Sequence, residues 1–227
     1  MIEVCLALYQ RFDRLPEILW QLLSQTNQNF NVNIWNNCEK NIDWKAISFF
    51  PKERLRVEGI GRNLGSCARF MLVKDVKGEV IVFIDDDLVF NNDFIEYNYK
   101  RYKEYNGEAL CGWFSKVFDK DYRNPIEEQL KNGSEADYIG TPGCIVNKKL
   151  FDIDENLFNI PNEFIKVEDL YLSYIARKHD FKLVSIDKKC YQINDGLGQN
   201  RKLHDYKQNA FKELREKHNW RLVKENK

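Results

Sequence analysis

Residues 80–87 read VIVFIDDD, five β-prone apolar residues followed by three carboxylates, and this stretch decides the fold. An apolar run without polar alternation is typical of a strand buried on both faces of a parallel sheet. Residues 4–9, VCLALY, have the same character. In open α/β sheets ligands bind beyond the carboxyl ends of the strands, which is where the three carboxylates come. The stretch therefore predicts an α/β protein with a polar site at one edge of its sheet.

The segments before this stretch alternate between strand and helix patterns. Apolar residues alternate with asparagine over 30–34, and a further short strand is expected over 55–57. A second helix is predicted over 64–72, capped by Asn63. A first helix follows the first strand, because apolar side chains recur there at helical spacing: Leu15, Ile18, Leu19, Leu22 and Leu23. Residues 1–90 are therefore predicted to form a doubly wound, Rossmann-like nucleotide-binding half with a mainly parallel central sheet.

The remainder of the chain follows a less regular, mixed pattern. Strands are predicted near 109–114, 138–140, 144–146 and 182–186, and helices from Glu168 and over 203–217. No internal repeat and no linker rich in Pro, Gly or Ser interrupts the sequence. We therefore expect a single domain over 1–227, made of a nucleotide-binding half (1–90), a second half (91–200) and a C-terminal helix (201–227).

Composition excludes several classes of protein. The 227 residues carry 35 Lys and Arg against 35 Asp and Glu, whereas a general nucleic-acid binder needs a basic surplus. The apolar runs are far shorter than the ~20 residues of a membrane helix, and Glu3 stands where a signal peptide carries basic residues. Six cysteines without a CxxC pair predict neither a zinc site nor a disulfide framework. We expect a reduced, cytoplasmic protein with no nucleic-acid partner and no transmembrane segment.

The triplet Asp85-Asp86-Asp87 is the first candidate site. Three neighbouring carboxylates repel one another unless a positive charge lies between them, and Mg²⁺ or Mn²⁺ prefers such oxygen ligands. An ordinary turn is the alternative, because Asp is common after strands. Three in a row behind a buried strand favour a metal site.

Two familiar phosphate-binding patterns are missing. The sequence after the first strand is Tyr9-Gln10-Arg11-Phe12-Asp13, so it lacks the glycines with which dinucleotide-binding enzymes approach a pyrophosphate. No G-x-x-x-x-G-K-[ST] pattern occurs either. The first absence argues against a dinucleotide-dependent redox enzyme, and the second excludes a P-loop NTPase.

The pair Glu168-Asp169 begins a predicted helix and allows two interpretations. Acidic residues in a first turn cap free N–H groups and favour the helix dipole, and local sequence alone favours this structural role. The functional alternative is a general base, a carboxylate held near a substrate hydroxyl.

Taken together, these motifs resemble the family 2-like glycosyltransferases of the GT-A fold. The strand-end turn Tyr9-Gln10-Arg11 and the second-strand end Asn36-Asn37 stand at the family's nucleotide-binding positions. Residues 63–69, NLGSCAR, match its N-x-G-x-x-x-A-R stretch, residues 85–87 its D-x-D motif, and Glu168-Asp169 the acidic pair that contains its base. The five elements agree in order and rough spacing over residues 2–186.

The resemblance implies a small single-domain glycosyltransferase that moves a hexosyl or deoxyhexosyl group from a nucleotide-diphosphate sugar, UDP-linked by default, to a glycan or glycoconjugate hydroxyl. Asp169 would be the general base of an inverting displacement. Asp87, Asp85 and His204 would hold Mn²⁺ or Mg²⁺, and residues 91–200 would bind donor sugar and acceptor. The implied donor-binding residues are Ala7, Tyr9, Arg11, Asn37, Arg62, Arg69, Asp85 and Asp86.

The sequence also departs from the family pattern. Asn36-Asn37 replaces an acidic pair that reads the donor's base, which leaves the base open. Phe70 stands where the family usually has Asn. For His204 the alternative is an ordinary solvated histidine. The apolar stripe Leu203, Tyr206, Ala210 and Leu214, with basic neighbours, could either pack onto the domain or meet a membrane.

Three rival functions fit parts of the sequence. A haloacid-dehalogenase-like phosphatase would use Asp85 and Asp87, although that family usually places its motif on the first strand. A nucleotidyltransferase shares the architecture but needs a Gly-rich basic loop after that strand. A non-catalytic domain that only binds nucleotide-sugar is the third alternative, and the retained Asp169 argues against it.

Overall fold

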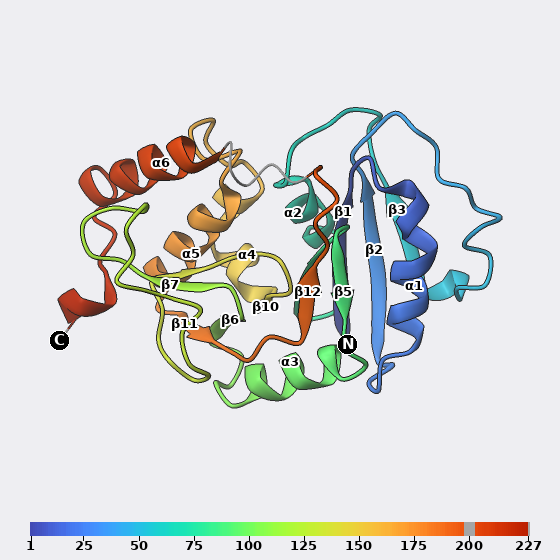
Figure 1. Cartoon of the computed structure of the whole chain (residues 1–227), viewed down its shortest axis with the longest axis horizontal. Helices are drawn as coiled ribbons and strands as arrows, with labels where there is room; N and C mark the ends of the chain where they lie inside the picture. Colours follow the sequence, from blue (N-terminus) through green and yellow to red (C-terminus); the bar gives the residue numbers. More distant parts are fainter. Residues whose placement is uncertain (198–202, 227) are drawn as a thin grey trace.

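The computed structural model describes residues 1–197 and 203–226, and its centre is a seven-stranded sheet (Figure 1). The strands lie in the order β11-β6-β10-β4-β1-β2-β3, and β10 is antiparallel to both of its neighbours. The sheet contains β1 (Ile2–Leu8), β2 (Phe30–Asn36), β3 (Leu55–Glu58), β4 (Val80–Asp85), β6 (Ala109–Gly112), β10 (Ile145–Asn147) and β11 (Lys182–Ser185). The predicted α/β class with a mostly parallel sheet is confirmed.

Helices cover both faces of this sheet, as its apolar strands require. In β1, Val4 and Leu6 point into one buried cluster, while Cys5 and Ala7 point into another. The first cluster is formed with α1 (Leu15–Leu23) and α3 (Phe94–Lys103), and the second with α2 (Ala68–Val73), α4 (Lys149–Ile153), α5 (Glu168–Lys178) and α6 (His204–Glu216). Two cores, one on each face, explain why β1 and β4 show no polar alternation.

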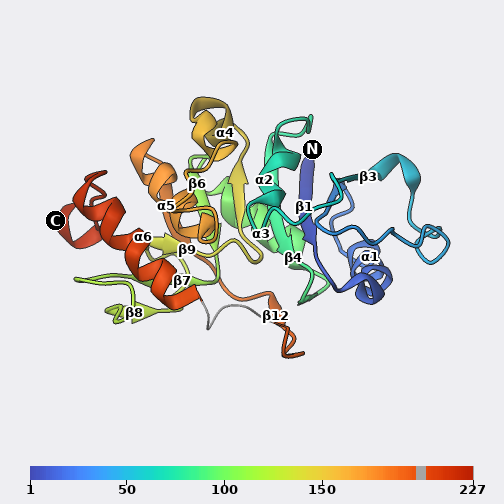
Figure 2. The ribbon, with the colours of Figure 1, turned by 90° about the horizontal axis from the view of Figure 1, so that it is seen from above.

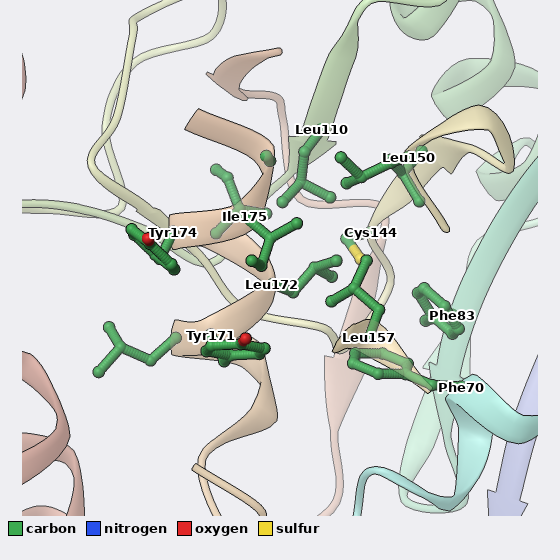
Figure 3. Close-up of a cluster of buried hydrophobic side chains, with 14 of the residues drawn as sticks. Phe70, Phe83, Leu110, Cys144, Leu150, Leu157, Tyr171, Leu172, Tyr174 and Ile175 are labelled. Carbon is green, nitrogen blue, oxygen red and sulfur yellow. The ribbon is translucent and has the colours of Figure 1, made fainter. Parts of the chain in front are cut away.

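The larger core holds the helix that carries Glu168 and Asp169 (Figure 3). Leu172 and Ile175 of α5 pack there beside Leu110 and Cys144, all fully or almost fully buried. On the same face, the rings of Phe70 and Phe83 lie 5.2 Å apart. Because burial of such side chains is the main stabilising term in folding, this packing fixes the start of α5 relative to the sheet.

The register of the parallel strands brings their ends together. Ala7 pairs with Asp85 of β4 on one side and with Trp35 of β2 on the other. The turns that follow β1, β2 and β4 therefore begin at the same edge of the sheet. The predicted site edge is produced by this alignment.

Small sheets and short helices complete the chain. β5 (Leu88–Phe90), directly after the Asp triplet, pairs with β12 (Cys190–Gln192), and β7 (Ser115–Val117) lies between β8 (Glu127–Glu128) and β9 (Tyr138–Ile139). Short 3₁₀ turns occupy Phe12–Arg14, Lys52–Arg54, Glu155–Leu157 and Val223–Asn226. Figures 1 and 2 show α6 and the C-terminal turn at one end of the molecule and α1 and β3 at the other.

One predicted helix boundary is wrong. The helix expected over 64–72 begins at Ala68, and Cys67 precedes it without a side-chain cap. Asn63 does not cap it, because the Asn63 Oδ1 atom accepts instead from the Gly65 N–H and the Asn37 amide. Residues 63–67 form a loop at the sheet edge.

The six cysteines form no disulfide, and five of them are buried. Within residues 1–197 and 203–226, no helix has the length and apolar character needed to cross a membrane. The third segment of the expected domain division, 201–227, begins in residues outside the described part of the chain.

Candidate active site

A cavity of about 850 Å³ lies at the carboxyl edge of the sheet. Its walls come from the ends of β1, β2 and β4, from the loop before α2, from residues 158–160 and 165–166, and from the first turns of α5 and α6. The predicted site residues that line it are Ala7, Tyr9, Arg11, Asn37, Arg69, Asp85, Asp86, Asp87 and Asp169.

Two predicted site residues lie elsewhere. Arg62 is exposed in the loop between β3 and α2 and does not line the cavity. His204 is exposed at the start of α6, where its ring centroid lies 6.5 Å from that of Tyr122. The fold does not bring either side chain to the carboxylates at the end of β4.

Both carboxylate oxygens of Asp86, the middle member of the triplet, accept hydrogen bonds from other residues of the protein. The residue is 5% exposed, its Oδ2 atom accepts from the Tyr9 N–H at 2.8 Å, and its Oδ1 atom accepts from Arg11 Nη1 at 2.7 Å. Burial raises its pKa, and these donors oppose the rise. Asp86 therefore holds the turn after β1, in which Gln10 has a left-handed φ of 65°.

Asp85 and Arg69 form an ion pair on the floor of the cavity. Arg69 is only 5% exposed, and its Nε atom donates to the Ser66 carbonyl at 3.0 Å. Burial alone would lower the pKa of Arg69, but the nearby Asp85 and Glu168 carboxylates outweigh it and raise the pKa. Asp85 keeps a side-chain exposure of 21%, so it still faces the cavity.

Asp87 carries the unsatisfied oxygen of the triplet. Its Oδ1 atom is buried without a hydrogen-bond partner, and its other oxygen lies 3.9 Å from Arg11 Nη2. Burial, followed by the Asp85 carboxylate, raises the pKa of Asp87 from 3.8 to about 6. A buried acceptor without a partner is rare, because it loses its hydrogen bonds to water and gains none from the protein.

The arrangement around Asp87 fits a divalent cation. Mg²⁺ and Mn²⁺ bind to one or two carboxylates and complete their shells with substrate phosphates. Among the residues that the structure describes, no group of three or more His, Cys, Asp or Glu side chains could hold a metal. Asp87 and Asp85 alone would therefore hold the ion, and the remaining ligands would come from a bound substrate and water.

Arg11 is held by carboxylates on both sides. Besides Asp86, it binds Asp195 after β12 through its Nε atom at 2.7 Å and its Nη2 atom at 3.0 Å. Arg14 donates from Nη1 to the Asp86 carbonyl at 2.8 Å. Asp195 and Arg14 were not expected from the sequence, because neither belongs to a motif near the triplet.

Asn37 shapes the loop before α2. Its amide nitrogen donates to Asn63 Oδ1 and to the Gly65 carbonyl, each at 2.9 Å, and its oxygen accepts from the Leu64 N–H at 2.7 Å. The residue is 3% exposed. The hydrogen bonds that the sequence offers at this position are thus directed into the protein.

Asp169 accepts hydrogen bonds on both carboxylate oxygens. Oδ2 accepts from Lys207 Nζ at 2.7 Å and from the Tyr138 hydroxyl, while Oδ1 accepts from the Leu170 N–H at 2.8 Å. Burial would raise the pKa of Asp169, but the Lys207 charge and these donors outweigh it and lower the pKa.

Its neighbour Glu168 behaves in the opposite way. Glu168 is 3% exposed and accepts from the hydroxyl groups of Ser66 and Thr141. Burial and the Asp169 charge raise its pKa. The N-cap residue Val167 makes no side-chain hydrogen bond, and of the two acids it is Asp169 that accepts from a first-turn N–H, that of Leu170.

Lys207 and Tyr138 are site residues that the sequence interpretation missed. The apolar stripe expected on α6 included Tyr206, but Tyr206 is 47% exposed and Lys207 is buried. Lys207 follows Leu203 by four residues and precedes Ala210 by three, so its spacing places it on the inner face. A lysine on the apolar face of a helix was the available signal. The remainder of α6 packs onto the domain through Ala210, Phe211 and Leu214.

The α/β fold places an acid-lined cavity at its strand ends, the usual position of a ligand site in such sheets, and comparison gives the family. The sequence model of glycosyl transferase family 2 matches residues 3–158, so the chain belongs to this family. Membership sets aside the phosphatase and nucleotidyltransferase alternatives.

An uncharacterized glycosyltransferase of Rickettsia conorii (strain ATCC VR-613 / Malish 7) is 28% identical over 222 residues. The alignment covers 88% of this chain but 33% of that protein, so the chain spans about a third of its curated relative.

Solved structures with the same fold include TarS of S. aureus. Its residues 1–349 in complex with UDP match with a TM-score of 0.65 at 19% identity, covering 84% of this chain and 59% of that one. The same fragment in complex with UDP-GlcNAc gives 0.63 at 17% identity, covering 85% and 58%. At these identities the likeness shows the fold, which is the GT-A fold expected from the sequence.

Proposed function

We propose that this protein transfers a sugar from a nucleotide-diphosphate sugar, with a UDP-sugar as the donor, to a hydroxyl group of a glycan or glycoconjugate. The observation that carries the proposal is the pairing, in one cavity, of Asp87 with its unsatisfied buried oxygen and Asp169 with its ionised carboxylate. Family membership and the UDP and UDP-GlcNAc complexes of TarS support this substrate class.

Asp87 and Asp85 are the proposed ligands of Mn²⁺ or Mg²⁺. A bound divalent cation would neutralise charge on the diphosphate as it leaves. Arg11 keeps the turn after β1 in place through Asp86, so the Asp87 carboxylate stays at the cavity wall. His204, a ligand implied by the resemblance, is not part of this proposal, because its side chain is exposed and does not line the cavity.

Asp169 is the proposed general base of a single, inverting displacement. The acceptor oxygen forms a bond to the anomeric carbon, the bond from that carbon to the diphosphate oxygen breaks, and the acceptor proton moves to Asp169. A carboxylate has about four lone-pair sites. Two donors occupy Oδ2 and one occupies Oδ1, so the proton is received at Oδ1.

The proposed compartment is the cytoplasm, with the acceptor reached there or at a membrane surface. The six unpaired cysteines support a reducing compartment. The hexosyl or deoxyhexosyl nature of the transferred group rests on the family resemblance.

The test is release of nucleoside diphosphate from a panel of UDP- and GDP-sugars with Mn²⁺, alone and with candidate acceptors, for the native protein and Asp169→Asn. Release by the native protein and its loss in Asp169→Asn, with donor binding kept in calorimetry, is the expected result. Binding without turnover in the native protein would instead identify a nucleotide-sugar-binding module.

A further inference from the structure

Lys207 lies in a buried cluster with the proposed base. Its Nζ atom is 2.7 Å from Asp169 Oδ2 and 3.0 Å from the Tyr138 hydroxyl, which itself donates to the same Asp169 oxygen. The three side chains come from α6, α5 and β9. The fold thus brings an ammonium group, a phenol and a carboxylate together from three separate elements.

Packing alone does not account for this lysine. The side chain of Lys207 is only 11% exposed, and a buried ammonium group without a partner is strongly unfavourable. Well-packed apolar residues often stabilise a protein as much as a buried ion pair does, or more. Of the other buried positions of α6, Ala210, Phe211 and Leu214 are apolar and Gln208 is polar, so an apolar residue would also serve a purely structural role at position 207.

The cluster determines which oxygen of Asp169 remains available. The Lys207 and Tyr138 donors both bind Oδ2, whereas only the Leu170 N–H binds Oδ1. Because Lys207 and Tyr138 hold one side of the carboxylate, its plane is fixed and its less occupied oxygen has a defined position.

We propose that Lys207 is a positioning residue of the transfer reaction, which keeps Asp169 ionised in its buried place and fixes its carboxylate so that Oδ1 receives the acceptor proton. This role rests on the proposed function, since it requires Asp169 to be the base. It also makes α6 part of the active site, beyond the residues 3–158 that the family model matches.

The other groups around Asp169 do not replace the Lys207 charge. Glu168 precedes it on α5, and the Glu168 charge also interacts with Lys207. Arg69 of α2 is paired with Asp85, while the Tyr122 and Cys144 side chains are neutral acids whose loss of a proton would add negative charge. Lys207 is therefore the cation that opposes the burial of Asp169.

Removing this charge shifts the titration of Asp169 in a defined direction. With Lys207 present, the pKa of Asp169 is lowered despite burial. In Lys207→Met, burial and Glu168 remain, so the pKa rises, by about 1–3 units for the loss of one adjacent opposite charge. Activity that needs ionised Asp169 then falls at a higher pH than in the native protein.

The experiment compares native protein, Lys207→Met, Lys207→Arg and the control Lys212→Met, which removes an exposed lysine of the same helix. The pKa of Asp169 is measured from ¹³C chemical shifts of the aspartate carboxyl groups, with Asp169→Asn giving the assignment. Release of UDP from the best UDP-sugar of the panel, with saturating Mn²⁺, is then followed from pH 3 to 9.

We expect Lys207→Met to raise the Asp169 pKa and to move the acidic limb of the rate profile upward by about 1–3 pH units. Lys207→Arg should restore most of both values, and Lys212→Met should match the native protein. An unchanged Asp169 titration and rate profile in folded Lys207→Met would overturn the proposal. If Lys207→Met does not fold, Lys207→Gln, which also removes the charge, is measured in the same way, and an unchanged Asp169 titration and rate profile in that variant would overturn the proposal too.

Failure of the positioning role is distinguishable from failure of the proposed function. If Asp169→Asn keeps turnover, Asp169 is not the base and the proposed mechanism fails. If Asp169→Asn loses turnover while Lys207→Met keeps the native profile, the mechanism stands and only the role of Lys207 fails.

Discussion

Replacing Asp87 by Asn tests whether the ionised carboxylate destabilises the folded protein when no metal is bound. Burial and Asp85 raise the pKa of Asp87 from 3.8 to about 6. At about 1.4 kcal/mol per pKa unit, its ionisation lowers the stability of the folded state by about 3 kcal/mol. Asn has nearly the same shape and no charge, but it loses the attraction to Arg11. We expect Asp87→Asn to be more stable than the native protein at pH 8 by about 1–3 kcal/mol.

The pH dependence follows from the direction of the shift. The folded pKa of Asp87 lies above the unfolded value, so between pH 3.8 and about 6 the folded state holds the proton more tightly. The stability associated with the protonated Asp87 is complete below pH 3.8 and is lost as the pH rises through about 6. The difference between Asp87→Asn and the native protein should therefore be large at pH 8 and small at pH 4.5.

Urea unfolding in EDTA at these two pH values measures the difference, and Asp86→Asn is the matched control. Both oxygens of Asp86 accept hydrogen bonds, so an amide NH₂ at this position would face the Tyr9 N–H or the Arg11 guanidinium. We expect Asp86→Asn to destabilise the protein by about 1–3 kcal/mol, although burial raises the pKa of Asp86 as well.

Mn²⁺ should stabilise the native protein more than it stabilises Asp87→Asn. A ligand that binds only the folded state raises its stability with concentration, so Mn²⁺ should raise the melting temperature of the native protein more than that of Asp87→Asn. If Asp87→Asn in EDTA at pH 8 is no more stable than the native protein, the ionised Asp87 carboxylate does not destabilise the fold, and its assignment as the cation-binding member of the triplet is refuted.

Three further substitutions test the roles of Asp169, His204 and Asp154. Asp169→Asn should keep donor affinity and lower turnover by at least about 10²-fold, as loss of a general base does, and retained turnover measured by UDP release would contradict this. His204→Ala should leave the Mn²⁺ affinity measured by calorimetry unchanged, because His204 is exposed outside the cavity wall, and a tenfold weaker affinity would restore it as a ligand. Asp154 is buried and accepts hydrogen bonds from Lys178 at 2.8 Å and from His179 at 2.7 Å. Burial opposes its charge, but these donors outweigh burial and lower the pKa of Asp154 to about 2. The stabilising effect of the ionised carboxylate is therefore present above pH 3.8 and is lost as the pH falls through about 2. Asp154→Asn should therefore lower the melting temperature at pH 7 more than at pH 3, and an equal loss at both values would argue against an ionised Asp154.

The strands that build the site could be predicted because each is a continuous apolar run. β1 and β4 are covered by helices on both faces, and that requirement is visible in the sequence itself. The position of the Asp triplet followed from the same pattern. Elements whose sequence is mixed were missed: α3 and α4 contain charged residues among their apolar ones, and the two or three residues of β5, β7, β8 and β12 are too short for a periodicity.

The distribution of roles among neighbouring acids could not be predicted, because it depends on partners distant in sequence. Asp85, Asp86 and Asp87 are identical in type and adjacent, yet Arg69 pairs with the first, Tyr9 and Arg11 bind the second, and the third keeps an unsatisfied oxygen. The Asp169 environment likewise depends on Lys207, which is 38 residues away in the sequence. Local pattern identifies such acids, and the tertiary fold assigns their chemistry.

The ion pairs between the basic and acidic side chains of the cavity explain why a protein with no net charge would use a cation to bind an anionic donor. Arg11, Arg69 and Lys207 line the cavity, but the charged group of each is already bound to a carboxylate. Lys166 also lines the cavity and donates to the Tyr206 hydroxyl, so its single ammonium charge faces the two negative charges of a diphosphate. Asp87 has no such partner on its buried oxygen. A divalent ion bound there would add the positive charge that the cavity lacks, and it would do so at the carboxylate whose buried oxygen has no hydrogen-bond partner.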